Sequence, residues 1–291
     1  MSSLRLPAPA KLNRFLHITG RRSDGYHLLQ TVFQLIDQMD WLTFESYDSL
    51  ELISDLPFPT QDNLIIRAAQ LLQHTTGCRQ GAQITLEKNL PMGGGLGGGS
   101  SDAATTLLAL NHLWETGLSI DELAQLGLKL GADVPVFVRG QNAWAEGVGE
   151  ILQPIALPET HFVVLTPNCS VSTAEIFNHP NLPRATPLID QAQFLAELKS
   201  SNIDKNTHND CDVVVRKLYP EVDQALQFLE DIQRQSTELF EAPQLTGTGA
   251  CVFLVTPTRA FADKILKQSP FNGFVCSGIG QSPVHSALNL L

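Results

Sequence analysis

A run of glycines constrains the fold of this chain more than any other feature. Gly93–Gly99 holds six glycines in seven positions, between a predicted strand at Ile84–Glu87 and a predicted helix at Asp102–Trp114. Because glycine loses more conformational entropy on folding than other residues, such a run weakens a fold unless its backbone angles are needed. A glycine loop that leads into a helix directs backbone N–H groups and the positive end of the helix dipole at one point. The sequence therefore predicts a phosphate site rather than a flexible linker.

The glycine loop differs from three familiar nucleotide-binding motifs. A P-loop needs Gly-Lys-Ser/Thr after its glycines, and no lysine follows here. Gly93, Gly95 and Gly98 match the dinucleotide fingerprint, but that motif needs a second strand with an acidic residue about 20 residues later. The sequence instead predicts a helix at Ser119–Leu130, with a capping box at its start. Because the His-Arg-Asp and Asp-Phe-Gly motifs of protein kinases are also absent, a phosphate loop of another class remains.

The charge balance limits the partners of this chain. Asp and Glu number 30 against 19 Lys and Arg, which gives a formal net charge of −11. Such an acidic protein is a poor partner for nucleic acid or an anionic membrane, so attraction for an anionic small molecule must be built locally. No apolar run reaches the roughly 18 residues that span a bilayer. Five separated cysteines without metal spacing indicate reduced thiols, and we expect a cytoplasmic protein.

Hydrophobic periodicity predicts an α+β chain with two domains, 1–157 and 158–291, divided near residues 156–159. In the first domain, strands are expected at 12–19, 31–37, 41–46 and 84–87 and helices at 64–74, 102–114 and 120–130. In the second domain, the expected strands are 162–165, 250–255 and 274–277, and the expected helices are 172–180, 191–198, 212–218, 221–234 and 259–267. This order favours a sandwich with helices on one face of a sheet.

Three separated segments resemble the motifs of the GHMP kinases, a superfamily of small-molecule kinases. Pro91–Asp102 resembles their central phosphate loop, Pro9–Asn13 their first motif and Leu245–Cys251 their third. As a set, these motifs are highly specific. The resemblance implies an N-terminal mixed α/β nucleotide-binding domain, a C-terminal ferredoxin-like α+β sandwich and an active site in the cleft between the domains.

Three further segments are similar to one branch of this superfamily: Arg22–His27, Leu130–Val138 and Asn209–Cys211. Kinases of that branch phosphorylate a cytidine diphosphate-linked methylerythritol on the non-mevalonate route to isoprenoid precursors. The resemblance implies transfer of the γ-phosphoryl group of ATP to the 2-hydroxyl of that substrate, with Mg²⁺ expected to neutralise phosphoryl charge. We expect a monomer or a weak homodimer. Another GHMP kinase activity, a nicotinamide-dependent oxidoreductase and a catalytically silent binding module are the alternatives.

The resemblance assigns the reaction to Lys11 and Asp133. Phosphoryl transfer needs an oriented hydroxyl and an acceptor for its proton, and Asp133 is the expected general base. Lys11 is expected beside it, where a cation keeps the carboxylate ionised and polarises the hydroxyl. Taken alone, Asp133 is equally typical of a capping carboxylate in a loop, and Lys11 of a solvated strand lysine.

The resemblance also assigns the recognition of both substrates. Tyr26 is expected to stack on the cytosine ring with Phe177 on its opposite face, while His27 hydrogen-bonds the base edge. Asn13 and Thr173 are expected to contact polar groups of the substrate. The residues expected around ATP are Pro91, Met92, Gly93, Gly94, Gly95, Leu96, Gly97, Gly98, Gly99, Ser100 and Ser101, together with Asn63, Leu64 and Lys88. The third-motif loop comprises Thr246, Gly247, Thr248 and Gly249, and the candidate Mg²⁺ ligands are Ser100, Ser101 and Asp102.

Overall fold

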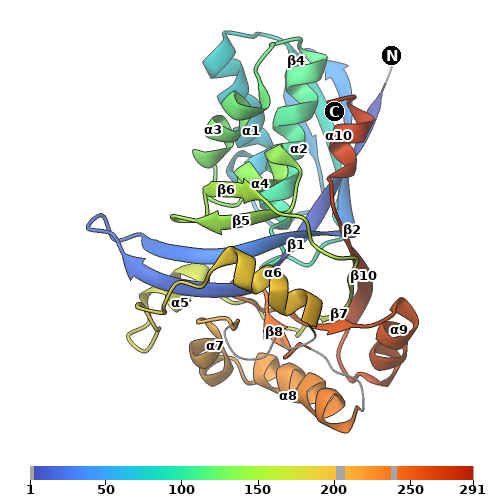
Figure 1. Ribbon diagram of the computed structural model, residues 1–291. Helices are drawn as coiled ribbons and strands as arrows, with labels where there is room; N and C mark the ends of the chain where they lie inside the picture. Colours follow the sequence, from blue (N-terminus) through green and yellow to red (C-terminus); the bar gives the residue numbers. More distant parts are fainter. Residues whose placement is uncertain (1–2, 201–206, 237–240, 291) are drawn as a thin grey trace.

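The computed structural model describes residues 3–200, 207–236 and 241–290 as two lobes that share one sheet (Figure 1). The strands of the first lobe are β1 (Leu4–Arg21), β2 (His27–Tyr47), β3 (Leu50–Ile53), β4 (Gly81–Glu87), β5 (Ala143–Glu146) and β6 (Ile151–Pro154). The strands of the second lobe are β7 (His161–Leu165), β8 (Gln244–Leu245), β9 (Val252–Thr256) and β10 (Gly273–Ile279). The sheet runs in the order β3-β4-β2-β10-β7-β9-β8, and both β1 and β5 also pair with β2. Because β10 pairs with β2, hydrogen bonds join the two lobes directly.

Helices cover the sheet in both lobes. The first lobe holds a 3₁₀ turn η1 (Thr60–Asp62), α1 (Leu64–Thr76), α2 (Gly98–Leu113), α3 (Ile120–Leu128) and α4 (Val134–Arg139). The later helices are α5 (Thr173–Asn178), α6 (Gln191–Ser200), α7 (Asp212–Leu218), α8 (Pro220–Gln235), α9 (Arg259–Gln268) and α10 (Pro283–Ala287). Every predicted helix is confirmed, and α4 and α10 are additional. Within the described ranges, no helix is long and apolar enough to cross a membrane.

The strands predicted at 31–37 and 41–46 are wrong as separate elements, because both belong to the single strand β2. The two parts pair with different neighbours. Leu35 and Ile36 pair with β10, whereas the residues from Trp41 to Tyr47 pair with β4. At the junction Asp40 is fully buried, and its carboxylate accepts hydrogen bonds from the backbone of Asn89 and Leu90. The polar stretch between the apolar segments is therefore held in strand geometry by the chain that leads to the glycine loop.

Helix α2 begins at Gly98, four residues before the predicted start, and this is a correction. The last two glycines of the run, with Ser100 and Ser101, thus form its first turn. Local sequence fixed the other helix ends more closely. Ser119 forms the predicted capping box of α3, and Asn63 caps α1, which ends at a left-handed Gly77.

Strand β1 passes through both hydrophobic cores and so places its middle between them. Leu6 and Ala8 pack in the core of the first lobe, against α1 and α2. Leu16 and Ile18 pack in the core of the second lobe, with β7, β9 and α8. The chain also returns after β10, since α10 packs on the first core. The division at 157/158 remains a prediction.

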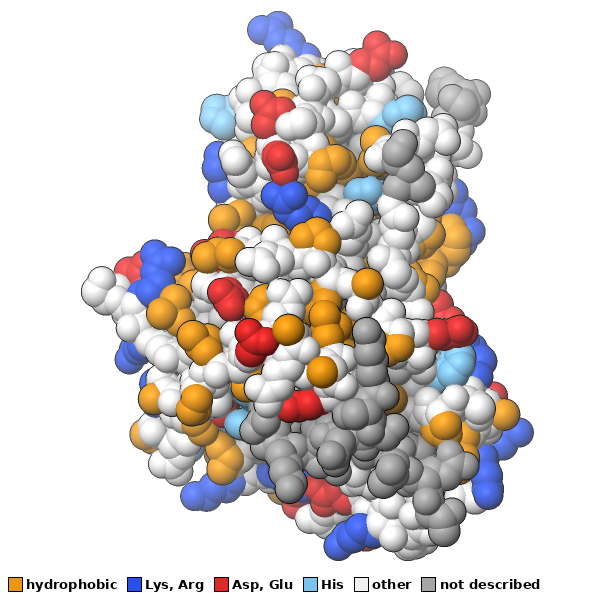
Figure 2. Space-filling view, viewed as in Figure 1, with side chains coloured by type: hydrophobic (Ala, Val, Ile, Leu, Met, Phe, Trp, Pro, Cys, Tyr) orange, Lys and Arg blue, Asp and Glu red, His pale blue; other side chains and the backbone are white. Residues whose placement is uncertain are grey.

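Charged side chains of both signs are interspersed on the face of the molecule shown in Figure 2, without a broad basic surface. That distribution agrees with the acidic net charge of −11. It also agrees with the expectation that any attraction for phosphate is local.

Candidate active site

A cavity of about 660 Å³ is lined by segments from both lobes. It is bordered by the middle of β1, the turn between β1 and β2, the glycine loop, the residues before α4, α5 and the loop after β8. The predicted site residues that line it are Lys11, Asn13, Tyr26, His27, Gly95, Gly97, Ser100, Asp133, Thr173, Phe177, Gly247 and Thr248. Residues far apart in sequence thus meet in one cavity, as the resemblance implies, and the roles assigned to them remain predictions.

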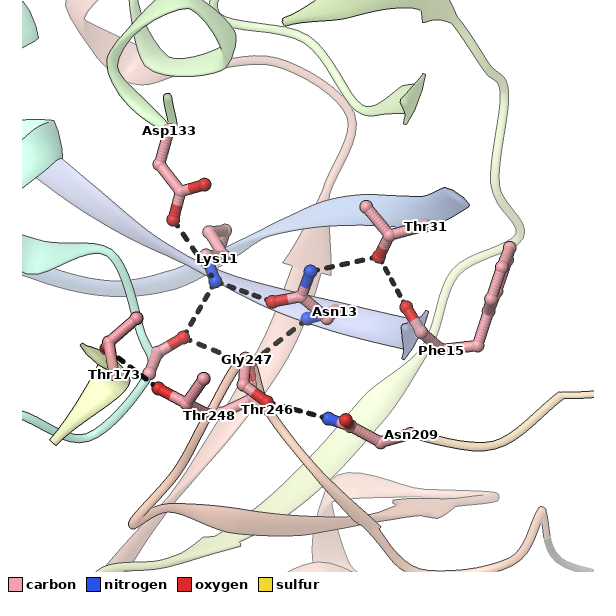
Figure 3. A network of polar contacts seen from close by, with 11 residues as sticks. Lys11, Asn13, Phe15, Thr31, Asp133, Thr173, Asn209, Thr246, Gly247 and Thr248 are labelled. Atoms are coloured by element: carbon pink, nitrogen blue, oxygen red, sulfur yellow. Dashed lines mark hydrogen bonds and ion pairs between the residues drawn. The ribbon is translucent and has the colours of Figure 1, made fainter. Parts of the chain in front are cut away.

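Lys11 is the centre of a polar network in this cavity (Figure 3). Its ammonium donates to Asn13 Oδ1 at 2.6 Å and to the carbonyl oxygen of Gly95 at 2.8 Å, and lies 3.5 Å from Asp133 Oδ2. The Lys11 side chain is 3% exposed, whereas that of Asp133 is 35% exposed. Burial lowers the pKa of Lys11, while the charge of Asp133 opposes this shift. The cation is therefore fixed inside the protein and the carboxylate remains reachable by a substrate.

The three sequence motifs are joined by hydrogen bonds through Asn13 and Thr246 (Figure 3). The backbone N–H of Asn13 donates to Thr246 Oγ1 at 3.1 Å, and that hydroxyl donates to the Gly95 carbonyl at 3.2 Å. Asn13 Nδ2 also donates to Thr31 Oγ1 at 2.9 Å, which fixes the orientation of its amide. The Gly95 carbonyl therefore accepts from both the first and the third motif.

The third-motif loop is itself held from two sides. Asn209 Nδ2 donates to the carbonyl oxygens of Leu245 and Gly247, each at 2.8 Å. Thr248 Oγ1 lies 2.9 Å from Thr173 Oγ1 of α5. The Asn209 segment, which distinguishes the branch in sequence, thus supports the loop instead of lining the cavity.

Lys88 does not stand free to meet a nucleotide in this structure. Its ammonium lies 2.5 Å from Asp40 Oδ2 and 2.8 Å from Asp102 Oδ2, so two carboxylates share one cation. Burial raises the pKa of Asp102 to about 7, although Lys88 opposes the shift. The two carboxylates raise the pKa of Lys88 despite its burial. This cluster ties β2, the residue after β4 and the N-terminal part of α2 together.

Other residues expected around ATP lie beside the same turn. A Cβ at Gly98 would be 3.0 Å from Lys88 Nζ, and a Cβ at Gly99 would be 3.7 Å from Leu64 Cδ1. Asn63 caps the adjacent α1, and Met92 is 52% exposed. Lys88, Leu64 and Asn63 thus gather around the start of α2, and none of them or Met92 lines the cavity that holds Lys11 and Asp133.

The candidate metal ligands differ in their surroundings. Ser100 lines the cavity, Ser101 is fully buried with an unpartnered hydroxyl, and Asp102 is paired with Lys88. Among the described residues, no cluster of three or more His, Cys, Asp or Glu side chains could hold a metal ion. Of these three candidates, Ser100 is the one that lines the cavity, so an ion bound there would keep phosphate and water oxygens as most of its ligands.

Three aromatic side chains, those of Tyr26, His27 and Phe177, line the same cavity. Tyr26 follows a turn at Gly25 and is 64% exposed, so its ring is available to a ligand. The rings of His27 and Phe177 lie 5.2 Å apart with an interplanar angle of 32°. Sequence reasoning missed Arg184, whose Nε donates to His27 Nε2 at 3.1 Å. Its position in a proline-rich loop gave no signal that it contacts His27.

Comparisons with known proteins agree with this geometry. The model of the GHMP kinases N terminal domain matches residues 63–141. A 4-diphosphocytidyl-2-C-methyl-D-erythritol kinase of Haemophilus ducreyi is 50% identical over 100% of this chain and 99% of its own. The same kinase of Pseudomonas syringae pv. syringae is 53% identical over 99% of this chain and 98% of its own.

Solved structures give the same picture. A crystal structure of 4-(cytidine 5'-diphospho)-2C-methyl-D-erythritol kinase is 31% identical with a TM-score of 0.82, covering 95% of this chain and 100% of that one. A homoserine kinase from Cytophaga hutchinsonii is 16% identical with a TM-score of 0.66, covering 97% and 96%. At that identity the second likeness concerns the fold alone.

Proposed function

The chain belongs to the GHMP kinases and, within them, to the 4-diphosphocytidyl-2-C-methyl-D-erythritol kinases, and on that premise we propose that Asp133 and Lys11 carry its phosphoryl transfer. It is a kinase with ATP as co-substrate, and its acceptor is the 2-hydroxyl of 4-diphosphocytidyl-2-C-methyl-D-erythritol, in the non-mevalonate pathway. The observation that carries the proposal is the ion pair of a buried lysine with a reachable carboxylate beside the glycine loop.

Asp133 accepts the proton of the acceptor hydroxyl in this proposal. As the O–H bond breaks, the substrate oxygen forms a bond to the γ-phosphorus, the bond from that phosphorus to the bridging oxygen breaks, and ADP leaves. Lys11 directs two of its three N–H donors at Asn13 and Gly95, so its position does not depend on the substrate. Its charge is thereby held 3.5 Å from Asp133 Oδ2.

The glycine loop and the start of α2 hold the phosphates of ATP in this proposal. The first turn of a helix presents backbone N–H groups without intrahelical partners, and its dipole favours an anion. Ser100 lines the cavity at that turn and is the residue that would contact a Mg²⁺ ion carried by the phosphates. The ion would neutralise charge on the transferred phosphoryl group.

Tyr26 and Phe177 are proposed to hold the cytosine between them, with His27 at its edge. The support is that all three line the same cavity as Asp133, and that Tyr26 is exposed while the other two rings are in contact. Asn13 and Thr173 line the same cavity and are proposed to contact polar groups of the substrate. An aromatic ring stacks on any base, so the choice of cytosine rests on the edge contact.

A substrate-panel assay tests the proposal. ADP release is measured with ATP, Mg²⁺ and one acceptor at a time: 4-diphosphocytidyl-2-C-methyl-D-erythritol, mevalonate or homoserine. Turnover is expected with the first acceptor and is expected to be lost in Asp133→Asn. Turnover with mevalonate or homoserine but not with the cytidyl compound would contradict the substrate assignment, and NADH binding seen by fluorescence would favour an oxidoreductase.

We also propose that the protein works in the cytoplasm as a monomer or weak homodimer. The five cysteines are free thiols, which suits a reducing compartment. Sedimentation velocity at micromolar concentration would show a single species or a concentration-dependent dimer. A stable higher oligomer would contradict this expectation.

A further inference from the structure

Arg184 is fixed against the base end of the cavity by four hydrogen bonds. Its Nε donates to His27 Nε2 at 3.1 Å, and its Nη1 donates to the carbonyl of Leu182 at 3.2 Å. Its Nη2 donates to the carbonyls of His179 and Phe177, at 2.8 and 3.2 Å. The guanidinium therefore cannot turn away from His27 without losing its hydrogen bonds to these backbone carbonyls.

This contact determines which ring nitrogen of His27 carries the proton. An arginine guanidinium has only donors, so Nε2 of His27 must accept with its lone pair. Burial and the nearby charges of Arg184 and Arg21 lower the pKa of His27, which disfavours the charged ring and agrees with an accepting Nε2. A neutral imidazole with a bare Nε2 carries its proton on Nδ1. Among the residues that the structure describes, no hydrogen bond reaches Nδ1, which leaves that N–H for a ligand.

We propose that Arg184 sets the base specificity of the cavity by holding His27 as the Nδ1–H tautomer. The inference rests on the proposed function, in which His27 meets the edge of the cytosine. At ring position 3, cytosine offers a lone pair and uracil offers an N–H. A fixed Nδ1–H donor therefore bonds cytosine and opposes uracil, whereas the other tautomer would accept from uracil. Arg184 is thus a positioning residue that acts through His27 and touches no reacting atom.

The kinetic test compares cytidine- and uridine-diphosphate-linked methylerythritol as acceptors. The wild-type protein is expected to prefer the cytidine compound, and Arg184→Met is expected to lower the ratio of the two kcat/KM values at least tenfold, about the effect of one mismatched hydrogen bond. Tyr26→Ala serves as the control, because lost stacking weakens both acceptors and leaves their ratio unchanged. If Arg184 only braces its loop, Arg184→Met weakens both acceptors equally, and the proposal is overturned.

In a spectroscopic test the deciding spectrum is that of the wild-type protein, and it does not depend on turnover. Nitrogen-15 NMR of histidine-labelled wild-type protein reports the protonation of each ring nitrogen, and His27→Asn assigns the signals. The expected spectrum at pH 7.5 shows a protonated Nδ1 and a bare Nε2 for His27, and Arg184→Met is expected to lose this preference. A proton on Nε2 in the wild-type protein would overturn the inference while leaving the kinase activity intact. Absence of turnover with the cytidine acceptor would instead refute the proposed function and, with it, the base specificity.

Discussion

Replacing Gly95 with alanine would force the glycine loop away from the third motif. Gly95 has a φ of +74°, and an alanine Cβ there would lie 1.9 Å from the carbonyl oxygen of Thr246. Because ordinary van der Waals contact begins at 3.4 Å, a separation of 1.9 Å requires the two segments to move apart by about 1.5 Å. The Cβ is fixed directly to the backbone and the oxygen belongs to it, so no side-chain rotation can relieve the overlap.

Such a shift would disturb the catalytic pair through the Gly95 carbonyl. That oxygen accepts from Lys11 Nζ at 2.8 Å and from Thr246 Oγ1 at 3.2 Å. Moving it displaces the lysine that stands 3.5 Å from Asp133. A misplacement of about 1 Å can cost about 100-fold in rate, equivalent to about 2.7 kcal/mol. The left-handed backbone adds a stability cost of about 1–2 kcal/mol for any residue with a Cβ.

Gly77→Ala is a matched control for this experiment. Gly77 has a φ of +73°, and a Cβ there meets nothing within 4 Å, so it carries the backbone strain without the overlap. Both variants should lose stability in urea unfolding, and only Gly95→Ala should lose about 100-fold in kcat/KM for ADP release. If Gly95→Ala kept its activity within twofold, or if Gly77→Ala lost as much, the close approach would not control catalysis.

Three further results are expected. Asp133→Asn should lower kcat by about 10²–10⁴-fold while calorimetry still shows ATP binding, because only proton acceptance is removed; near-normal kcat would refute the base assignment. Tyr26→Ala should raise KM for the cytidyl acceptor about tenfold by loss of stacking, and an unchanged KM would exclude that contact. Burial raises the pKa of Asp102 from 3.8 to about 7, so its contribution to stability is lost as pH rises through that window. The free energy of unfolding of wild type should therefore fall relative to that of Asp102→Asn as pH rises from 4 to 8, as measured by urea unfolding. A difference between the two proteins that stays constant with pH would disprove the shift.

Local signals in the sequence were sufficient for the ends of α1 and α3, but not for the start of α2 or for the short helices α4 and α10. Each of these ends is marked by residues next to it in the sequence: Asn63 and Gly77 for α1 and Ser119 for α3. Pattern alone therefore located them. Strand β2 was different, because its two halves owe their continuity to partners far away in the chain. Asp40 reads as a polar break in the sequence, and only its contacts with Lys88 and the backbone after β4 show why the strand continues.

Site residues that stand in a motif could be predicted from the sequence, whereas a single side chain outside any motif could not. Lys11 and Asp133 stand in motifs that resemble the family, and the structure brings them within 3.5 Å. Arg184 stands alone in a loop, where an arginine is ordinarily a surface residue. Its reach to His27 follows from how α5 and the following loop fold back, which no local pattern records.

The acidic net charge of the chain does not conflict with phosphate-bearing substrates, and the positions of the cations near the site explain why. Of the described residues that line the cavity, Lys11 is the one Lys or Arg, and Asp133 faces it. Lys88 is shared by Asp40 and Asp102, so these five side chains supply no net positive charge. In the proposed function, attraction for a triphosphate comes from backbone N–H groups and the dipole at the start of α2, and from a metal ion that would arrive with the nucleotide. A site of that kind depends on the path of the backbone, which is why the glycines of the loop matter more to this chain than its count of basic residues.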